Sequence, residues 1–324
     1  REQIAQSLHT LPNRIFFTSG GSESNNTVIK GYCLKHQADG KHIITTALEH
    51  HAVLEPIEYL VERFGFEVTI VQPRDGRIQA SDIKAALRPD TILVSTMFAN
   101  NETGDLLPII EIGEFLKDHP AAFHVDAVQA VGKVPVYPEE LGIDFLSASA
   151  HKFHGPKGIG FLYVRKGTPL APYASGGSQE NHMRAGTENI ASIVGMAAAL
   201  KKCVDGLKDT AEHLTRLETK LIMGLSDANV RFSRNGSAAH IPGNISLSFP
   251  GYSGEALLHR LDLMGICVST GSACNSRETQ ISHVLQAIKL EPELAKGTIR
   301  LSLGKNNTEG DIDEIVDALL RILK

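Results

Sequence analysis

The stretch 14–31, "RIFFTSGGSESNNTVIKG", joins a short apolar strand to a helix through a pair of glycines. The same unit recurs along the first half of the chain, where apolar or β-branched runs alternate with stretches of helical periodicity. The predicted strands are 14–19, 41–47, 66–72, 91–98, 121–127, 143–149 and 158–164, and the predicted helices include 23–39, 50–64 and 109–118. Strands that alternate with helices indicate an α/β fold, in which helices cover both faces of a mainly parallel seven-stranded sheet.

The pattern changes after about residue 205, which predicts a smaller α+β domain. We therefore expect a large domain over 13–205 and a small domain over 206–324. The small domain is predicted to contain helices at 207–226, 254–264 and 281–289, strands at 244–249, 265–269 and 297–304, and a final helix. Apolar residues at helical spacing predict the core face of that last helix: Ile312, Ile315, Val316, Leu319, Leu320 and Leu323.

Composition excludes several classes of protein. With 324 residues, 42% of them hydrophobic, and a net charge of −5, the chain can bury a large core and has no basic stripe for direct nucleic-acid binding. No apolar run is long enough for a membrane-spanning helix, and residues 1–14 lack the apolar centre of a secretory signal. The cysteines, at 33, 203, 267 and 274, are too few and scattered for a disulfide framework. We expect a cytoplasmic protein with free thiols and no membrane contact.

The glycine pair in the opening stretch is a candidate phosphate cradle. A strand ends at Thr18, Gly20 and Gly21 allow a tight turn, and Ser22 begins a helix whose N–H groups point outward. The alternative is a purely structural turn in which a serine caps the helix.

The stretch 121–133, "AAFHVDAVQAVGK", ends an apolar strand at Asp126. A carboxylate is unfavourable there unless it meets a cation, so we expect something positive to face it. Gln129 lies within reach of the same ligand if a turn follows Asp126. His124 and Asp126 share one face of the strand and could bind a metal, but no third ligand follows at a suitable spacing, so no metal is expected.

Lys152 lies in "SASAHKFHGPKGIG", residues 147–160, between the end of a strand and a turn rich in glycine and proline. A lone lysine is most simply a surface charge. Here Asp126, Gln129 and the phosphate cradle also fall at predicted strand ends, where open α/β sheets bind their ligands. This combination indicates pyridoxal phosphate attached to Lys152, with Asp126 keeping the pyridine nitrogen protonated.

Two residues of the second domain are further candidates. Arg300 points away from Ile299 and Leu301 in its strand, where it could bind a substrate carboxylate or simply face water. Cys274 lies in "STGSACNSRETQIS", a run of small and polar residues that predicts an accessible loop, whereas we expect Cys267 to be buried.

The chain resembles the cysteine desulfurases of the NifS/IscS kind, within the class-V aminotransferase group of pyridoxal-phosphate enzymes. The motifs that carry this resemblance occur in the family's order: "TSGGSESNN", "EHHAV", "NNETG", "HVDAVQAVGK", "SASAHKFHGPKGIG", "MRAGTEN", "STGSACNS" and "TIRLSLG". The resemblance implies a fold-type I homodimer that converts L-cysteine to L-alanine. It also implies transfer of the sulfur, as a persulfide, to acceptor proteins for iron–sulfur cluster assembly, tRNA thiolation or related pathways.

The resemblance also implies a role for each matching residue. Lys152 would be the Schiff-base lysine, Asp126 the partner of the pyridine nitrogen and Cys274 the sulfur-accepting nucleophile. His50 would stack on the cofactor ring and is the candidate proton acceptor for Cys274, while Asn101 and Gln129 would contact the ring hydroxyl region. Arg300, with Asn101, would bind the substrate. The phosphate would be held by Gly21, Ser22, Ser149 and His151, joined by Thr187 of a second subunit.

Two features depart from the family pattern. Ser22 stands where the family usually has threonine, a change that keeps the hydroxyl. Family members also carry a further segment before the position that matches Arg1, including a turn that lines the substrate side. The resemblance therefore supports the cofactor site more directly than it supports activity. Alongside an active desulfurase, two alternatives stay open: a related pyridoxal-phosphate lyase or aminotransferase, and a catalytically weak scaffold that docks sulfur-transfer partners.

Overall fold

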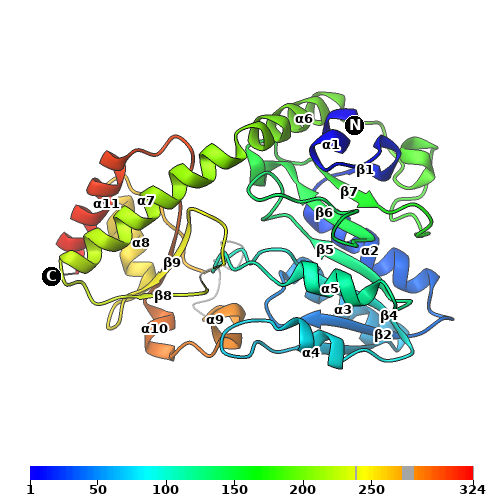
Figure 1. Cartoon of the computed structure of the whole chain (residues 1–324), viewed down its shortest axis with the longest axis horizontal. Coiled ribbons are helices and arrows are strands. Elements are labelled where there is room, and N and C mark those ends of the chain that lie inside the picture. The colour runs from blue at the N-terminus through cyan, green and yellow to red at the C-terminus, as the bar shows by residue number, and fades with distance from the viewer. Residues whose placement is uncertain (238, 272–280, 324) are drawn as a thin grey trace. The chain divides into compact units, whose positions relative to one another are not determined.

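The computed structural model describes residues 1–237, 239–271 and 281–323. Its contacts divide the chain into two compact units, each visible in Figure 1. The first unit comprises Arg1–Pro73, Ile78–Ala99 and Leu107–Asp205, and the second comprises Arg74–Arg77, Asn100–Leu106 and Gly206–Lys324. The assignment of cofactor binding to 13–205 and of the substrate arginine and reactive cysteine to 206–324 stays a prediction.

A seven-stranded sheet forms the centre of the first unit, in the order β1-β7-β6-β5-β4-β2-β3. Its strands from β2 to β6 pair in parallel, and β7 is inserted antiparallel between β6 and β1. The mainly parallel sheet predicted from sequence is therefore confirmed. The strands are β1 (Ile15–Thr18), β2 (His42–Thr46), β3 (Glu67–Val71), β4 (Thr91–Met97), β5 (Ala122–Asp126), β6 (Phe145–Ser149) and β7 (Gly160–Val164).

Helices α2 (Gly21–Lys35) and α3 (His51–Phe64) pack their apolar faces on this sheet. Val28 and Ile29 of α2 and Ile57 of α3 join one buried cluster with strand residues such as Leu93 and Phe145. Burying these side chains is the main stabilising contribution to such a layer. The remaining helical elements are α1 (Glu2–Ser7), η1 (Pro12–Arg14), α4 (Ala80–Ala85), α5 (Ile109–Leu116), η2 (Ala150–Phe153), η3 (Gln179–His182) and α6 (Ile190–Asp205).

The sheet brings the carboxyl ends of several strands to the same end of the sheet. Because β1 and β6 both run antiparallel to β7, they share the direction of the parallel strands, and their carboxyl ends meet at the same side. Gly160 pairs with both Thr18 of β1 and Ser149 of β6. A Cβ at Gly160 would lie 2.7 Å from Gly20 Cα, so only glycine allows the Gly20 turn to approach β7 this closely.

The second unit is built on a three-stranded antiparallel sheet in the order β10-β9-β8. Its core includes five of the six apolar residues predicted for the last helix: Ile312, Ile315 and Leu319 are buried, and Val316 and Leu323 pack against them. Leu320 is half-buried and is not part of this cluster. The elements are α7 (Leu207–Asp227), β8 (Ser233–Arg234), β9 (Asn244–Ser248), α8 (Gly254–Asp262), α9 (His283–Ala287), α10 (Pro292–Lys296), β10 (Thr298–Ser302) and α11 (Glu309–Ile322).

The stretch 265–269 differs from its prediction. It forms no strand: only Ser269 pairs, in a single bridge to Arg300. Ile266 and Val268 pack against the core, so the alternation of side chains turns Cys267 outward, and the expectation that Cys267 is buried is wrong. The two-residue strand β8 was not predicted from the sequence. Within the part of the chain described, no helix is long and apolar enough to span a bilayer.

Candidate cofactor and substrate site

Asp126 ends β5 with its side chain buried. Its Oδ1 accepts a hydrogen bond from Val128 N at 3.0 Å, and its Oδ2 accepts one from Asn25 Nδ2 at 2.7 Å. Burial raises the pKa of Asp126, although these hydrogen bonds and the charges of His50 and Lys152 oppose the rise. Both hydrogen-bond donors are neutral. The carboxylate is thus fixed in position by groups that do not cancel its charge, and a ligand cation would suit it.

Helix α2 connects two parts of this region. Its first turn begins at Gly21, and Asn25, one turn later, donates to Asp126. A Cβ on Gly21 would lie 2.5 Å from Val128 Cγ2, so glycine lets the helix start pack directly on the turn that follows Asp126. The position of Asp126 is therefore coupled to the position of the helix start.

A pocket of about 320 Å³ opens beside the start of α2. Its lining includes Gly21, Ser22, Ser149 and His151, the four residues of this chain that the family resemblance assigns to the phosphate. Because the first-turn N–H groups of a helix lack partners within the helix and carry partial positive charge, this end of α2 favours an anion. The pocket therefore has the polarity and donor set that a phosphate requires.

Lys152 and His151 lie in η2, the single helical turn that follows β6. Lys152 is half-buried, and its charge acts on Asp126. His151 Nδ1 lies 3.0 Å from Ser149 Oγ. Burial, reinforced by the charges of Lys152 and Lys157, lowers the pKa of His151, which favours the neutral imidazole.

His50 is the N-cap of α3. Its Nδ1 accepts a hydrogen bond from Ala52 N at 3.0 Å, which places the proton of the neutral ring on Nε2. The ring orientation is thereby fixed, as a stacking role requires. The same hydrogen bond occupies the lone pair of Nδ1, which does not favour His50 as the proton acceptor for Cys274.

Glu49, the residue before His50, is fully buried. Its Oε1 accepts hydrogen bonds from Thr46 Oγ1 at 2.6 Å and from Met97 N at 2.9 Å. Burial raises the pKa of Glu49 to about 8, and the negative charge of Asp126 adds to that rise. Glu49 is thus a protonated carboxyl group at neutral pH.

His124 and Gln129, which flank Asp126 in sequence, have other partners. His124 is buried between Ser95 Oγ at 2.8 Å and Ser147 Oγ at 3.0 Å, and burial lowers its pKa to about 3. It is therefore a neutral link between three strands. Gln129 Oε1 accepts a hydrogen bond from Lys133 Nζ at 2.9 Å. Among the described residues, no group of three or more His, Cys, Asp or Glu side chains is arranged to hold a metal.

Arg300 and Asn101 meet in the second unit. Arg300 Nη1 donates to the backbone oxygen of Asn101 at 2.7 Å and lies 3.5 Å from that of Gly271. The structure thus joins the two residues that the family resemblance assigns to the substrate. The cofactor candidates from Gly21 to Lys152, apart from Asn101, belong to the first unit.

The other two predicted residues are Cys274 and Thr187. Cys274 falls in 272–280, outside the described residues. Thr187 is exposed in the first unit, in the segment that precedes α6. Its assignment to the phosphate of a second subunit stays a prediction.

Four further residues of these sites had no predicted role: Asn25, Glu49, Glu23 and Arg184. All four lie within the motifs that carry the family resemblance, so a signal was present. What sequence could not supply was their pairing, because Asn25 meets Asp126 across 101 positions and Glu23 meets Arg184 across 161.

The described residues fit pyridoxal phosphate. The buried Asp126 suits a protonated ring nitrogen, and the pocket at the start of α2 suits the phosphate. Lys152 follows the strand next to that of Asp126, as the covalent attachment would require.

Comparison with known proteins agrees with this geometry. The family model for class-V aminotransferases matches residues 1–315. The cysteine desulfurase IscS of Dictyoglomus turgidum is 48% identical over all of this chain and 82% of its own length. The corresponding protein of Methanosarcina thermophila is 44% identical over all of this chain and 80% of its own length.

Solved structures point the same way. A NifS-like protein superposes with a TM-score of 0.93 at 39% identity, covering 99% of this chain and 86% of that one. SspA in complex with cysteine superposes with a TM-score of 0.81 at 35% identity, covering 95% of this chain and 86% of that one. With nearly the whole length matched in sequence and in structure, this chain belongs to the class-V aminotransferase family and, within it, to the cysteine desulfurases of the NifS/IscS kind.

Proposed function

We propose that this chain is a pyridoxal-phosphate-dependent cysteine desulfurase that converts L-cysteine to L-alanine and keeps the sulfur as a persulfide on Cys274. The observation that carries the proposal is the double use of α2. Its first turn lines the phosphate pocket, and its Asn25 holds the buried Asp126. A ligand with an anionic group at one end and a cationic ring nitrogen at the other matches this arrangement. Cysteine as the substrate is supported by a relative named cysteine desulfurase and by a similar structure in complex with cysteine.

Three residues have distinct proposed roles in the reaction. When bound, pyridoxal phosphate supplies an electron sink for the charge that develops at the substrate Cα. Asp126 keeps the ring nitrogen protonated, and the amine of Lys152 takes the Cα proton. Arg300 binds the substrate carboxylate through its guanidinium.

Cys274 completes the reaction as a thiolate. Its sulfur forms a bond to the substrate sulfur while the substrate Cβ–S bond breaks. The electron pair left on Cβ takes up a proton, and the Lys152 amine returns a proton to Cα, which together yield alanine. Only the thiolate is nucleophilic, so the rate depends on the ionised fraction of Cys274.

The partners and the compartment are part of the proposal. We infer a homodimer in which Thr187 of one subunit reaches the phosphate of the other, and transfer of the persulfide sulfur to acceptor proteins. The cytoplasm is the proposed compartment, because a reducing environment keeps such thiols free.

The test is to incubate the purified protein with pyridoxal phosphate and L-cysteine and to measure alanine and, after adding a reductant, sulfide. Cys274→Ser should bind the cofactor normally and yet release almost no alanine or sulfide, since a hydroxyl is a poor nucleophile toward sulfur at neutral pH. Cys267→Ser is the matched control, because Cys267 is an exposed thiol in the same unit. It should keep parental activity.

Mass spectrometry of alkylated peptides locates the sulfur before reductant is added. Extra sulfur on Cys274 supports the mechanism. Alanine production with an unmodified Cys274 would contradict it, and neither alanine nor persulfide would favour the scaffold alternative.

A further inference from the structure

Glu23 presents an electrostatic problem at the phosphate pocket. Of the described residues that line this pocket, Glu23 is the acidic one. A phosphate carries up to two negative charges, and a carboxylate in the same wall would repel it. Yet Glu23 is structurally useful, because its Oε2 accepts a hydrogen bond from Ser19 N at 3.0 Å and so holds the turn that leads into α2.

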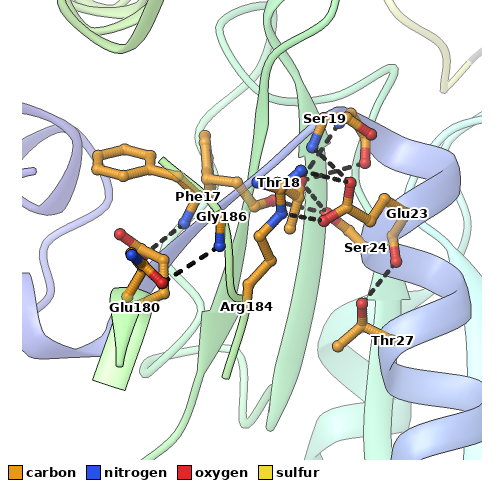
Figure 2. A network of polar contacts seen from close by, with 12 residues as sticks. Phe17, Thr18, Ser19, Glu23, Ser24, Thr27, Glu180, Arg184 and Gly186 are labelled. Carbon is orange, nitrogen blue, oxygen red and sulfur yellow. Dashed lines mark hydrogen bonds and ion pairs between the residues drawn. The ribbon is translucent and has the colours of Figure 1, made fainter. Parts of the chain in front are cut away.

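Arg184 binds this carboxylate with two nitrogens (Figure 2). Its Nε lies 3.0 Å from Glu23 Oε1, and its Nη2 lies 3.4 Å from Oε2. The Glu23 side chain is 11% exposed and that of Arg184 is 33% exposed. Burial would raise the pKa of Glu23, but the hydrogen bonds from Arg184 and Ser19 lower it below its usual value. Glu23 is therefore ionised, and its charge is compensated from outside the pocket lining.

The segment that carries Arg184 is itself anchored. Ala185 N donates to Ala174 O at 3.0 Å, and Gly186 N donates to Gln179 Oε1 at 3.2 Å. Glu180 accepts a hydrogen bond from Phe17 N of the edge strand β1 at 2.8 Å, and Figure 2 shows this contact beside the Arg184 pair. Arg184 is thus presented to Glu23 by a fixed loop.

We propose that Arg184 is a positioning residue for cofactor binding, which neutralises Glu23 so that this carboxylate can shape the start of α2 without repelling the cofactor phosphate. The inference rests on the proposed function, since it takes the occupant of the pocket to be the phosphate of pyridoxal phosphate.

The proposal predicts an asymmetric response to substitution. Arg184→Gln leaves the Glu23 charge in the pocket wall and should weaken pyridoxal phosphate binding about tenfold or more at low ionic strength. Added salt should reduce that loss, because it screens partly exposed charges. Glu23→Gln combined with Arg184→Gln should restore binding to within about threefold of the parent, and Arg184→Lys, which keeps the charge, should stay within a similar margin.

Two controls separate charge from shape. Arg165→Gln removes an arginine of similar exposure, 34%, that lies 3.5 Å from Asp144, and it should leave binding unchanged. Pyridoxal, which lacks the phosphate, should bind Arg184→Gln and the parent equally well. Binding is followed by cofactor absorbance, and thermal unfolding confirms that each variant is folded.

The outcomes are distinguishable. Equal weakening in Arg184→Gln and in the double variant would show that the pair acts through structure, and an equal loss of pyridoxal affinity would show the same; either overturns the inference. If Arg184→Gln does not fold, the test is the comparison of Arg184→Lys with the double variant. Weaker pyridoxal phosphate binding in both variants would overturn the inference. A parent that binds no pyridoxal phosphate would overturn the proposed function and this inference with it.

Discussion

Two buried carboxylates, Asp126 in the first unit and Glu218 in the second, are held in opposite ways. Glu218 lies 2.6 Å from Arg234 Nη2, a permanent cation, and 3.0 Å from His240 Nε2, which is cationic when protonated. Burial would raise the pKa of Glu218, but His240 and Arg234 lower it. Asp126 is bonded to the neutral donors Asn25 and Val128 N, and its pKa is raised.

The difference separates structural from functional electrostatics. Glu218 is compensated within the fold and links α7 to β8, so its charge serves stability. Among the described residues, Asp126 is held by neutral donors and not by such an ion pair. Keeping its carboxylate ionised therefore lowers the stability of the cofactor-free protein, and a bound cation would form the favourable charge interaction that the fold itself does not supply.

The largest expected effect comes from neutralising Asp126. Asp126→Asn should lower the rate of alanine formation between about 100-fold and 1,000-fold, the range found when one electrostatic stabiliser is removed from an active site. The fold should tolerate the change, because Asn25 Oδ1 has no hydrogen-bond partner among the described residues and a flipped Asn25 amide can accept from the new side chain. Steady-state kinetics and denaturant unfolding of the cofactor-free protein give the two readouts.

This prediction fails in either of two ways. Turnover close to the parent would remove Asp126 from the catalytic machinery. A marked loss of stability in the cofactor-free variant would place Asp126 in the same structural class as Glu218.

Glu49, whose pKa is affected by the charge of Asp126, should make the stability of the protein depend on pH. Its pKa is about 8 in the folded chain and 4.5 ordinarily, so between these values the unfolded chain loses a proton that the folded chain keeps. The contribution of Glu49 to stability is thus complete below about pH 4.5 and is lost as the pH rises to about 8. The unfolding free energy of the cofactor-free protein should fall by up to roughly 1.4 kcal/mol per pH unit across that window.

Glu49→Gln is the matched variant, because it keeps the side-chain shape and removes the titration. Urea unfolding at several pH values should give a flatter profile for this variant than for the parent. Identical profiles would mean that Glu49 ionises in the folded protein as readily as in the unfolded one.

The smallest expected effect comes from breaking the compensated site. Glu218→Gln leaves His240 and Arg234 without their anion and should lower the unfolding free energy by about 1 to 2 kcal/mol at neutral pH. Because the pKa of Glu218 is lowered in the fold, its stabilisation is present above about pH 4.5 and is lost as the pH falls through the lowered pKa. The parent and the variant should therefore converge in acid.

The surface pair of Glu255 and His259 is the control for that measurement. Their atoms lie 3.9 Å apart with both side chains about two-thirds exposed, so Glu255→Gln should change stability by less than about 0.5 kcal/mol. A similar effect for Glu218→Gln would show that the Glu218 cluster is no more than a surface network.

Much of the first unit followed from local pattern. Each of its seven strands overlaps a predicted one, because alternation of apolar runs and helical stretches is a local property of a parallel sheet. The placement of Gly21, Asp126 and Lys152 at strand ends followed for the same reason. The prediction of a strand at 265–269 was wrong. Apolar residues of this stretch pack on a core cluster without forming a ladder of backbone pairs, and the local pattern of such a segment is the same as that of a strand.

By itself, the sequence determined the α/β class, the candidate lysine, carboxylate and phosphate turn, and the family. Only the tertiary structure decided which polar residues meet: Asn25 with Asp126, Glu23 with Arg184, and His124 with hydroxyls on both neighbouring strands. These pairs join residues far apart in the chain, and the antiparallel insertion of β7 brings the glycine turn beside Ser149. Local propensity and periodicity act over a few residues, whereas the charge state of a buried group depends on whatever the fold packs against it.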